Sequence, residues 1–167
     1  MPIVLVGGGS RSGKSRYALE LARGRGSRLG FLATAQAFDQ EMADRIARHR
    51  DERASEFVTI EEPRDIAQAI ANRHDLDAIV VDCLTLWVSN LMLADLAIGV
   101  DPLIEAARRN PATVIFVTNE VGCGIVPENA LSRRFRDLAG TVNQRIAAAA
   151  DEVYYMAFGI PMKVKPS

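Results

Sequence analysis

Short apolar runs alternate along the chain with segments of helical periodicity. Residues 3–6 form a continuous apolar run that ends in glycines, which is typical of a strand buried on both faces. In residues 39–53, Met42, Ile46 and His49 fall at i, i+4 and i+7, the spacing of one helix face. The same patterns predict further strands at 28–33, 57–60, 78–81, 113–117, 153–156 and 162–164, and further helices at 14–23, 63–73, 84–96, 102–109 and 131–150.

This alternation of strands and helices predicts an α/β fold, a mostly parallel sheet with helices on both faces. Ligands in such folds bind at the carboxyl ends of the strands. Three segments directly follow predicted strands: the glycine loop after residue 6, then Asp82, then Asn119 with Glu120. We therefore expect all three at one edge of a nucleotide-binding domain, and we expect that one domain to span residues 1–167.

The composition is that of an ordinary globular protein. Of the 167 residues, 49% are apolar and 25% are charged, and the net charge is -1, which gives no reason to expect nucleic-acid or membrane binding. Cys83 and Cys123 lack the spacing of a zinc site or a disulfide framework, so we expect packed thiols in a reducing cytoplasm. The N-terminal residues predict a strand and no signal peptide, and no apolar run reaches the roughly 20 residues of a membrane span.

A phosphate-binding motif follows the first predicted strand. Its residues are Gly8, Gly9, Ser10, Arg11, Ser12, Gly13, Lys14 and Ser15. They match the P-loop pattern G-x-x-x-x-G-K-[ST], and a strand before and a helix after give the required context. In this motif backbone N–H groups and the helix N-terminus surround phosphate oxygens, Lys14 reaches the β- and γ-phosphates, and Ser15 ligates Mg²⁺. The alternative is a glycine turn that fits the pattern by chance.

Asp82 ends the apolar run at 78–81. A carboxylate in this place holds Mg²⁺ through water in many P-loop proteins. The alternative is an N-cap of the helix predicted from residue 84, and both roles are compatible.

His49 is surrounded in the sequence by Arg45, Arg48, Arg50 and Arg53. Arginines at this density suit polyphosphate binding, because the guanidinium group matches phosphate oxygens. They equally suit a solvated helix face paired with acidic neighbours, and a histidine on an apolar helix face is more often packed than functional. Spacing alone leaves both alternatives open. His74 lies in a polar turn and is expected at the surface, and residues 122–127, with two glycines, either line a substrate pocket or form a simple turn.

Taken together, the motifs resemble one enzyme family, the bifunctional adenosylcobinamide kinase / adenosylcobinamide-phosphate guanylyltransferases of cobalamin biosynthesis. The resemblance runs nearly end to end. It rests on the segments GGSRSGKSR at 8–16, DQEMADRIARHRD at 39–51, TIEEP at 59–63, VDCLT at 81–85, VTNEVGCGIVPEN at 117–129, FRDLAG at 135–140 and VNQR at 142–145.

The resemblance implies a RecA-like P-loop fold, a homotrimer and two reactions. The enzyme would phosphorylate adenosylcobinamide with ATP or GTP, and would then transfer GMP from GTP through a covalent GMP-histidine, at the position of His49, with Mg²⁺ as cofactor. Nucleotide contacts carried over from the family are Gly8 to Ser15, Ala33, Thr34, Ala35, Arg50, Asp51, Glu52, Arg53, Glu61 and Asp82.

Two rival functions remain at this stage. One is a small-molecule kinase that transfers only the γ-phosphate, in which His49 has no covalent role. The other is a nucleotide-dependent switch, which would need segments that order on the γ-phosphate. The P-loop is common to all three functions, so the histidine separates them.

Overall fold

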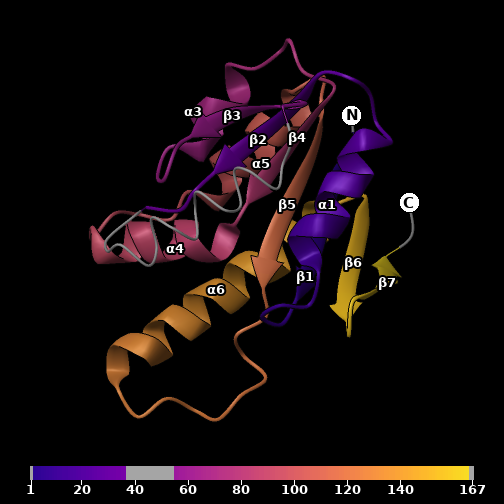
Figure 1. Cartoon of the computed structure of the whole chain (residues 1–167). Helices are drawn as coiled ribbons and strands as arrows, with labels where there is room; N and C mark the ends of the chain where they lie inside the picture. Colours follow the sequence, from indigo (N-terminus) through magenta and orange to yellow (C-terminus); the bar gives the residue numbers. More distant parts are fainter. Residues whose placement is uncertain (1, 37–54, 166–167) are drawn as a thin grey trace.

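The computed structural model describes residues 2–36 and 55–165, and a seven-stranded sheet forms its centre (Figure 1). The strands are β1 (Ile3–Gly8), β2 (Leu29–Ala33), β3 (Phe57–Glu61), β4 (Ala78–Asp82), β5 (Thr113–Asn119), β6 (Glu152–Ala157) and β7 (Ile160–Lys165). Their order across the sheet is β3-β2-β4-β5-β1-β6-β7. Strands β1 to β6 pair in parallel, and β7 runs antiparallel to β6 at the edge. This arrangement confirms the predicted mostly parallel sheet.

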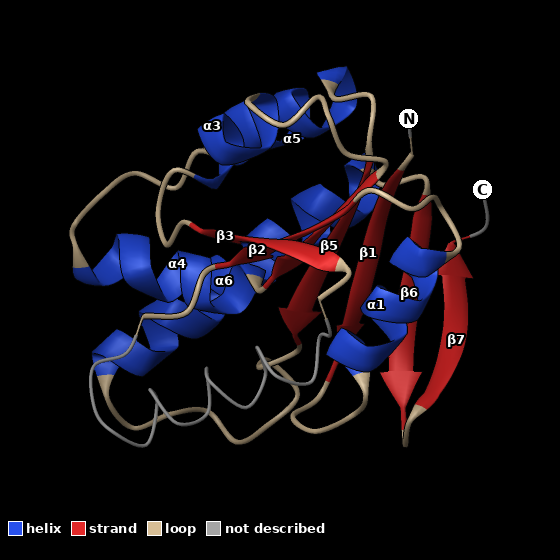
Figure 2. Cartoon of the chain, turned by 45° about the horizontal axis from the view of Figure 1, so that its top comes forward, coloured by secondary structure: helices blue, strands red, loops and turns tan. Residues whose placement is uncertain are grey.

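Helices cover both faces of the sheet (Figure 2). The helices are α1 (Lys14–Arg23), α3 (Ile66–Ala71), α4 (Leu84–Leu93), α5 (Val100–Arg109) and α6 (Ala130–Ala149). Helix α1 packs on β1, β4 and β5, where Val6, Val80 and Val117 join its buried alanines in one apolar cluster. The other four helices share the second cluster, which contains strand residues such as Val81 and Phe116. The apolar runs are continuous because successive side chains enter opposite, equally buried clusters.

Several predicted helix boundaries differ from the structure, and two of the differences have a visible cause. The helix expected from residue 63 begins at Ile66, because Asp65 caps it by accepting a hydrogen bond from the Gln68 N–H. The Glu62 carboxylate accepts hydrogen bonds from the N–H groups of Arg64 and Asp65, which hold the chain in a turn before the helix. The helix expected at 84–96 ends at Leu93, and Asp95 then takes a positive φ of 53°. The helix predicted at 39–53 lies outside the described residues. Among the described helices, none has the length and apolar character of a membrane span.

Candidate active site

The three segments expected at one edge of the sheet meet there. In the register of the parallel strands, Gly8 on β1 lies opposite Asn119 on β5, and Asp82 on β4 lies opposite Val117 on β5. The Glu120 N–H also donates to the Gly8 carbonyl at 3.0 Å. The start of the P-loop, Asp82 and Asn119 therefore share the carboxyl edge of three adjacent strands.

Two glycines allow the P-loop to take its shape. Gly8 has a φ of 150°, and a Cβ atom there would lie 2.8 Å from Ser12 Oγ and 2.9 Å from the carbonyl oxygen of Met156. Gly13 has a φ of 89° and precedes α1, so it provides the left-handed turn that leads into the helix. A side chain at either position would displace the loop, which explains why the motif requires glycine at both.

Lys14 is buried in the first turn of α1. Its Nζ donates to the Gly9 carbonyl and lies 3.5 Å from Ser12 Oγ, so the loop backbone holds the ammonium group. Burial lowers the pKa of Lys14 from its usual value, and the negative charge of Asp82 opposes this shift. A cation held in this way presents a point charge to phosphate oxygens within the loop.

Ser15 and Asp82 are in direct contact. The Ser15 hydroxyl donates to Oδ2 of Asp82 at 2.5 Å, which joins α1 to the carboxyl end of β4. Both groups offer the oxygen ligands that Mg²⁺ prefers, so the pair fits the metal expected at a P-loop. Helix α4 has Cys83 at its N-cap position, with no side-chain capping bond, so Asp82 is not the N-cap residue.

Thr34 connects the end of β2 to the residue after Asp82. Its hydroxyl donates to the Cys83 carbonyl and accepts from the Cys83 N–H, both at 2.8 Å. Its own N–H donates to the Asp82 carbonyl at 3.1 Å, and Asn90 Nδ2 donates to its carbonyl at 2.8 Å. Thr34 is fully buried, and its hydrogen bonds fix the backbone beside Asp82. Ala33 and Ala35 flank it and are partly buried.

Among the remaining expected nucleotide contacts, the structure describes Glu61. Glu61 is exposed at the end of β3, opposite Ala33 in register. Four strand spacings of about 4.8 Å separate β3 from β1, so Glu61 lies roughly 19 Å from the P-loop strand along the same edge. The structure does not bring Glu61 into the Lys14 cluster. His49, Arg50, Asp51, Glu52 and Arg53 lie outside the described residues.

A polar network behind the edge was not anticipated from the sequence. Thr85 Oγ1 accepts from the Asn119 N–H at 2.7 Å, and Thr118 Oγ1 donates to Asn143 Oδ1 at 2.6 Å. Asn143 Nδ2 in turn lies 3.4 Å from the Asn119 carbonyl. The available signal was Thr85, a polar residue near the start of a mostly apolar helix, since buried polar groups need partners.

The two cysteines differ in their exposure to solvent. Cys83 is buried, and burial raises the pKa of its thiol to about 11, so it is a packed and unreactive side chain as predicted. Cys123 is exposed, so the prediction that it packs is wrong. It belongs to residues 122–126, which are all exposed in the connection from β5 to α6. His74 is exposed, as expected.

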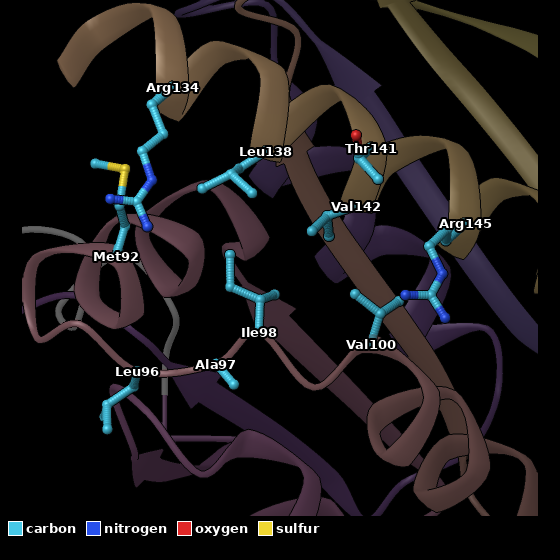
Figure 3. Close-up of a pocket in the computed structure, with 10 residues that line it drawn as sticks. All are labelled: Met92, Leu96, Ala97, Ile98, Val100, Arg134, Leu138, Thr141, Val142 and Arg145. Atoms are coloured by element: carbon cyan, nitrogen blue, oxygen red, sulfur yellow. The ribbon is translucent and has the colours of Figure 1, made fainter. Parts of the chain in front are cut away.

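A cavity of about 330 Å³ lies apart from this edge, between α6 and the connection from α4 to α5 (Figure 3). Its lining is mostly apolar, with two arginines from α6: Met92, Leu96, Ala97, Ile98, Val100, Arg134, Leu138, Thr141, Val142 and Arg145. None of these residues belongs to the P-loop or to the Asp82 segment. In the described ranges no group of three or more histidine, cysteine or acidic side chains forms a metal centre.

A parallel sheet with a glycine loop between β1 and α1, and a serine–aspartate pair beside it, defines a P-loop NTPase fold. Solved structures agree on the fold alone. The flagellar accessory protein FlaH from Methanocaldococcus jannaschii matches with a TM-score of 0.58 and 14% identity, over 99% of this chain and 79% of that chain. An ATPase from the type III secretion system of pathogenic bacteria gives a TM-score of 0.56 and 13% identity, over 97% and 56% of the two chains.

Proteins related in sequence identify the family as well as the fold. Residues 4–164 match the family described as cobinamide kinase / cobinamide phosphate guanyltransferase. The bifunctional adenosylcobalamin biosynthesis protein CobU of Salmonella typhimurium is 45% identical, over 98% of this chain and 99% of its own. The bifunctional adenosylcobalamin biosynthesis protein CobP of Pseudomonas aeruginosa is 42% identical, over 96% of each chain. The chain therefore belongs to the cobinamide kinase / cobinamide phosphate guanyltransferase family, which confirms the resemblance drawn from its motifs.

Proposed function

We propose that this chain performs both reactions of its family at the carboxyl edge of the sheet. It phosphorylates the hydroxyl of adenosylcobinamide with ATP or GTP. It then transfers GMP from GTP to that phosphate, giving adenosylcobinamide-GDP and pyrophosphate. The observation that carries the proposal is the cluster of Lys14, Ser15 and Asp82 around a P-loop in a chain matched to this family from residue 4 to residue 164.

In the first reaction, residues Gly8 to Ser15 hold the triphosphate and Lys14 contacts its β- and γ-phosphates. Ser15 and Asp82, the latter through water, would hold Mg²⁺. When bound, this ion offsets negative charge on the phosphates. The substrate hydroxyl oxygen bonds to the γ-phosphorus, the bond from that phosphorus to the β-phosphate oxygen breaks, and the hydroxyl proton is released.

In the second reaction, His49 is the nucleophile. Its neutral imidazole bonds to the α-phosphorus of GTP and the bond to the β-phosphate oxygen breaks, which releases pyrophosphate. The substrate phosphate then attacks the same phosphorus, and the nitrogen–phosphorus bond breaks. The covalent intermediate divides one difficult displacement into two easier ones. Neighbouring Arg50 and Arg53 would neutralise phosphate charge.

The other family contacts complete the nucleotide site. Ala33, Ala35, Asp51, Glu52 and Glu61 would bind the nucleoside part of GTP. The roughly 19 Å between the P-loop strand and the strand of Glu61 is comparable to the length of an extended nucleoside triphosphate. The proposal includes one catalytic domain over residues 1–167, a homotrimer, and a cytoplasmic location where the nucleotide substrates are made.

A labelling experiment tests the covalent step. The protein is incubated with Mg²⁺ and GTP carrying label in the α-phosphate. We expect label on the protein that is acid-labile and base-stable, as a phosphoramidate is. His49→Ala should abolish the label, and His74→Ala is the matched control, because His74 is the other histidine of the chain and is exposed in a turn.

The kinase step is measured separately with γ-labelled nucleotide and adenosylcobinamide. His49→Ala should keep this activity within a few-fold of wild type. Folded wild-type protein that transfers the γ-phosphate but takes up no α-label would refute the guanylyltransferase half and leave a plain kinase. Hydrolysis without transfer to adenosylcobinamide would favour the switch.

A further inference from the structure

Residues 122–126 form an exposed, partly apolar loop beside the phosphate-binding motif. They lie in the connection from β5 to α6, which leaves the sheet at the same edge as the P-loop (Figure 1). Ile125 is 97% exposed and Val126 is 59% exposed. Adjacent apolar side chains left in water at the rim of a site are the kind of surface that a ligand or partner covers.

Both ends of this loop are fixed to the fold. At its start, the Glu120 N–H donates to the Gly8 carbonyl at 3.0 Å, and the Glu120 carboxylate accepts from the Gly122 N–H at 2.5 Å. At its end, Arg133 of α6 donates to the Pro127 carbonyl at 2.9 Å. Because its ends are already held, the loop loses less conformational freedom when a ligand covers it.

Gly124 is a glycine that the described fold does not require. Its φ lies outside the left-handed region, and a Cβ atom there would meet no atom of the described residues within 4 Å. Gly8 and Gly13 of the P-loop, in contrast, both have a positive φ. A bare stretch of backbone next to two apolar side chains allows close approach by a flat molecule.

The charge of this segment separates the possible ligands. Residues 120–129 include Glu120 and Glu128 and no basic residue. Negative charge disfavours the phosphates of a nucleotide, for which Lys14 offers a cation in the P-loop. The corrin macrocycle of adenosylcobinamide has a large apolar face and holds cobalt(III) with a net positive charge, so it matches both the apolar side chains and the carboxylates.

The loop is also within reach of the phosphoryl group that is transferred. Gly124 is four residues beyond Glu120, so its Cα lies at most roughly 14 Å from the residue that contacts the P-loop. Adenosylcobinamide carries its reactive hydroxyl at the end of a short flexible arm on the macrocycle. A hydroxyl placed at the γ-phosphate therefore leaves the macrocycle close to this edge of the sheet.

We infer that residues 122–126 are the docking surface for one face of the corrin macrocycle, with Ile125 and Val126 as apolar contacts and Gly124 beneath the ring. Water displaced from the ring face and from the two side chains supplies the affinity. The inference rests on the proposed function and names the place where its second substrate binds.

Affinity for adenosylcobinamide tests the assignment. Its Kd is measured by equilibrium dialysis in dim light, with Mg²⁺ and a non-hydrolysable GTP analogue present. Ile125→Ser and Val126→Ser should each raise the Kd by roughly 10-fold, because serine removes most of the apolar area that the ring would cover. The KM for adenosylcobinamide should rise by a similar factor, whereas the KM for GTP should stay within about twofold.

Val164→Ser is the matched control for Val126→Ser, because Val164 on β7 is 62% exposed. It should leave the Kd unchanged. Gly124→Val is a second measurement that keeps the apolar side chains. Its added bulk points into open space in the described fold, so it should lower affinity for adenosylcobinamide without lowering the melting temperature.

Three results would overturn the inference. The first is a Kd for adenosylcobinamide that neither the serine variants nor Gly124→Val changes. The second is an equal loss of affinity for GTP. The third is a changed sedimentation coefficient of Ile125→Ser with an unchanged Kd, which would identify the loop as an interface between copies of the chain.

The wild-type protein separates this inference from the proposed function. Wild type that neither binds nor phosphorylates adenosylcobinamide would refute both. Wild type that binds and phosphorylates it, with unchanged affinity in the loop variants, would refute the docking surface alone.

Discussion

The hydroxyl of Ser15 and the carboxylate of Asp82 are joined by a hydrogen bond of 2.5 Å, although 67 residues separate them in the chain. If both hold one Mg²⁺, then Ser15→Ala and Asp82→Asn should each lower the kinase rate about 10²-fold, because each weakens several kcal/mol of charge stabilisation at the phosphates. The double variant should lose less than the product of the two effects. Steady-state rates across a Mg²⁺ titration measure this, with Ser89→Ala on α4 as a serine control. Multiplicative losses would contradict a shared metal.

Thr34→Val tests how the backbone beside Asp82 is held. The substitution keeps the shape of the side chain but leaves the Cys83 N–H and carbonyl without their Thr34 partner. We expect the free energy of unfolding to fall by about 2–4 kcal/mol, since each buried group left unpaired costs about 1–3 kcal/mol. Urea denaturation measures the change. Thr59→Val, on the exposed surface of β3, is the control and should be near neutral. A cost equal to that of the control would show that the bonds to Cys83 do not stabilise the fold.

The two thiols should react at very different rates. Cys123 is exposed, whereas Cys83 is buried with a pKa raised to about 11 by burial. A disulfide reagent added to the native protein at pH 8 should modify one thiol per chain quickly, and the second only in denaturant. Cys123→Ser should remove the fast phase. Fast modification of two thiols in native protein would mean that the region around Cys83 opens readily.

Asp77 should contribute to stability above pH 4 and lose that contribution as the solution is acidified. The side chain of Arg28 hydrogen-bonds its carboxylate, and this contact is the main reason that the pKa of Asp77 falls to about 2 from an ordinary 3.8. Because the folded pKa lies below the unfolded one, the stabilisation is complete above about pH 4 and disappears between pH 4 and pH 2.

Chemical denaturation at a series of pH values measures this effect. Asp77→Asn and Arg28→Gln should both be less stable than wild type at pH 5 and should approach it near pH 2. A gap that stays constant from pH 5 to pH 2 would exclude this pair as its source.

The apolar runs located the central strands, because a strand buried on both faces gives a short continuous apolar run bounded by turn residues. Every strand expected from the sequence is present, and the position of Gly8, Asp82 and Asn119 at one edge follows from parallel pairing of their strands. Helix starts were less predictable. Pro63 fits a first helical turn, yet its carbonyl accepts from Asn90 Nδ2 and the chain turns at Glu62, a tertiary contact that local sequence does not encode.

In the candidate site, too, local sequence predicted the motifs but not the tertiary contacts around them. Local pattern identified the P-loop and Asp82, since each is defined by a motif and the strand before it. The residues that fix the neighbouring backbone come from elements far away in the sequence: Thr34 hydrogen-bonds the backbone of Asp82 and Cys83, and Asn143 contacts Thr118 and Asn119. A threonine in an apolar segment and an asparagine in a long helix have many equally ordinary explanations until the fold places them.

The close approach of Gly8 to Met156 has a consequence for how the protein is made. Strand β1 obtains its two neighbours from residues 113–119 and 152–157, so the contact order around the phosphate loop is high. While the chain is being synthesised, the loop emerges long before the strands that flank it. Nucleotide binding can therefore help only after β5 and β6 have emerged, and a ribosome-bound chain stopped before residue 152 should not gain protease resistance from GTP.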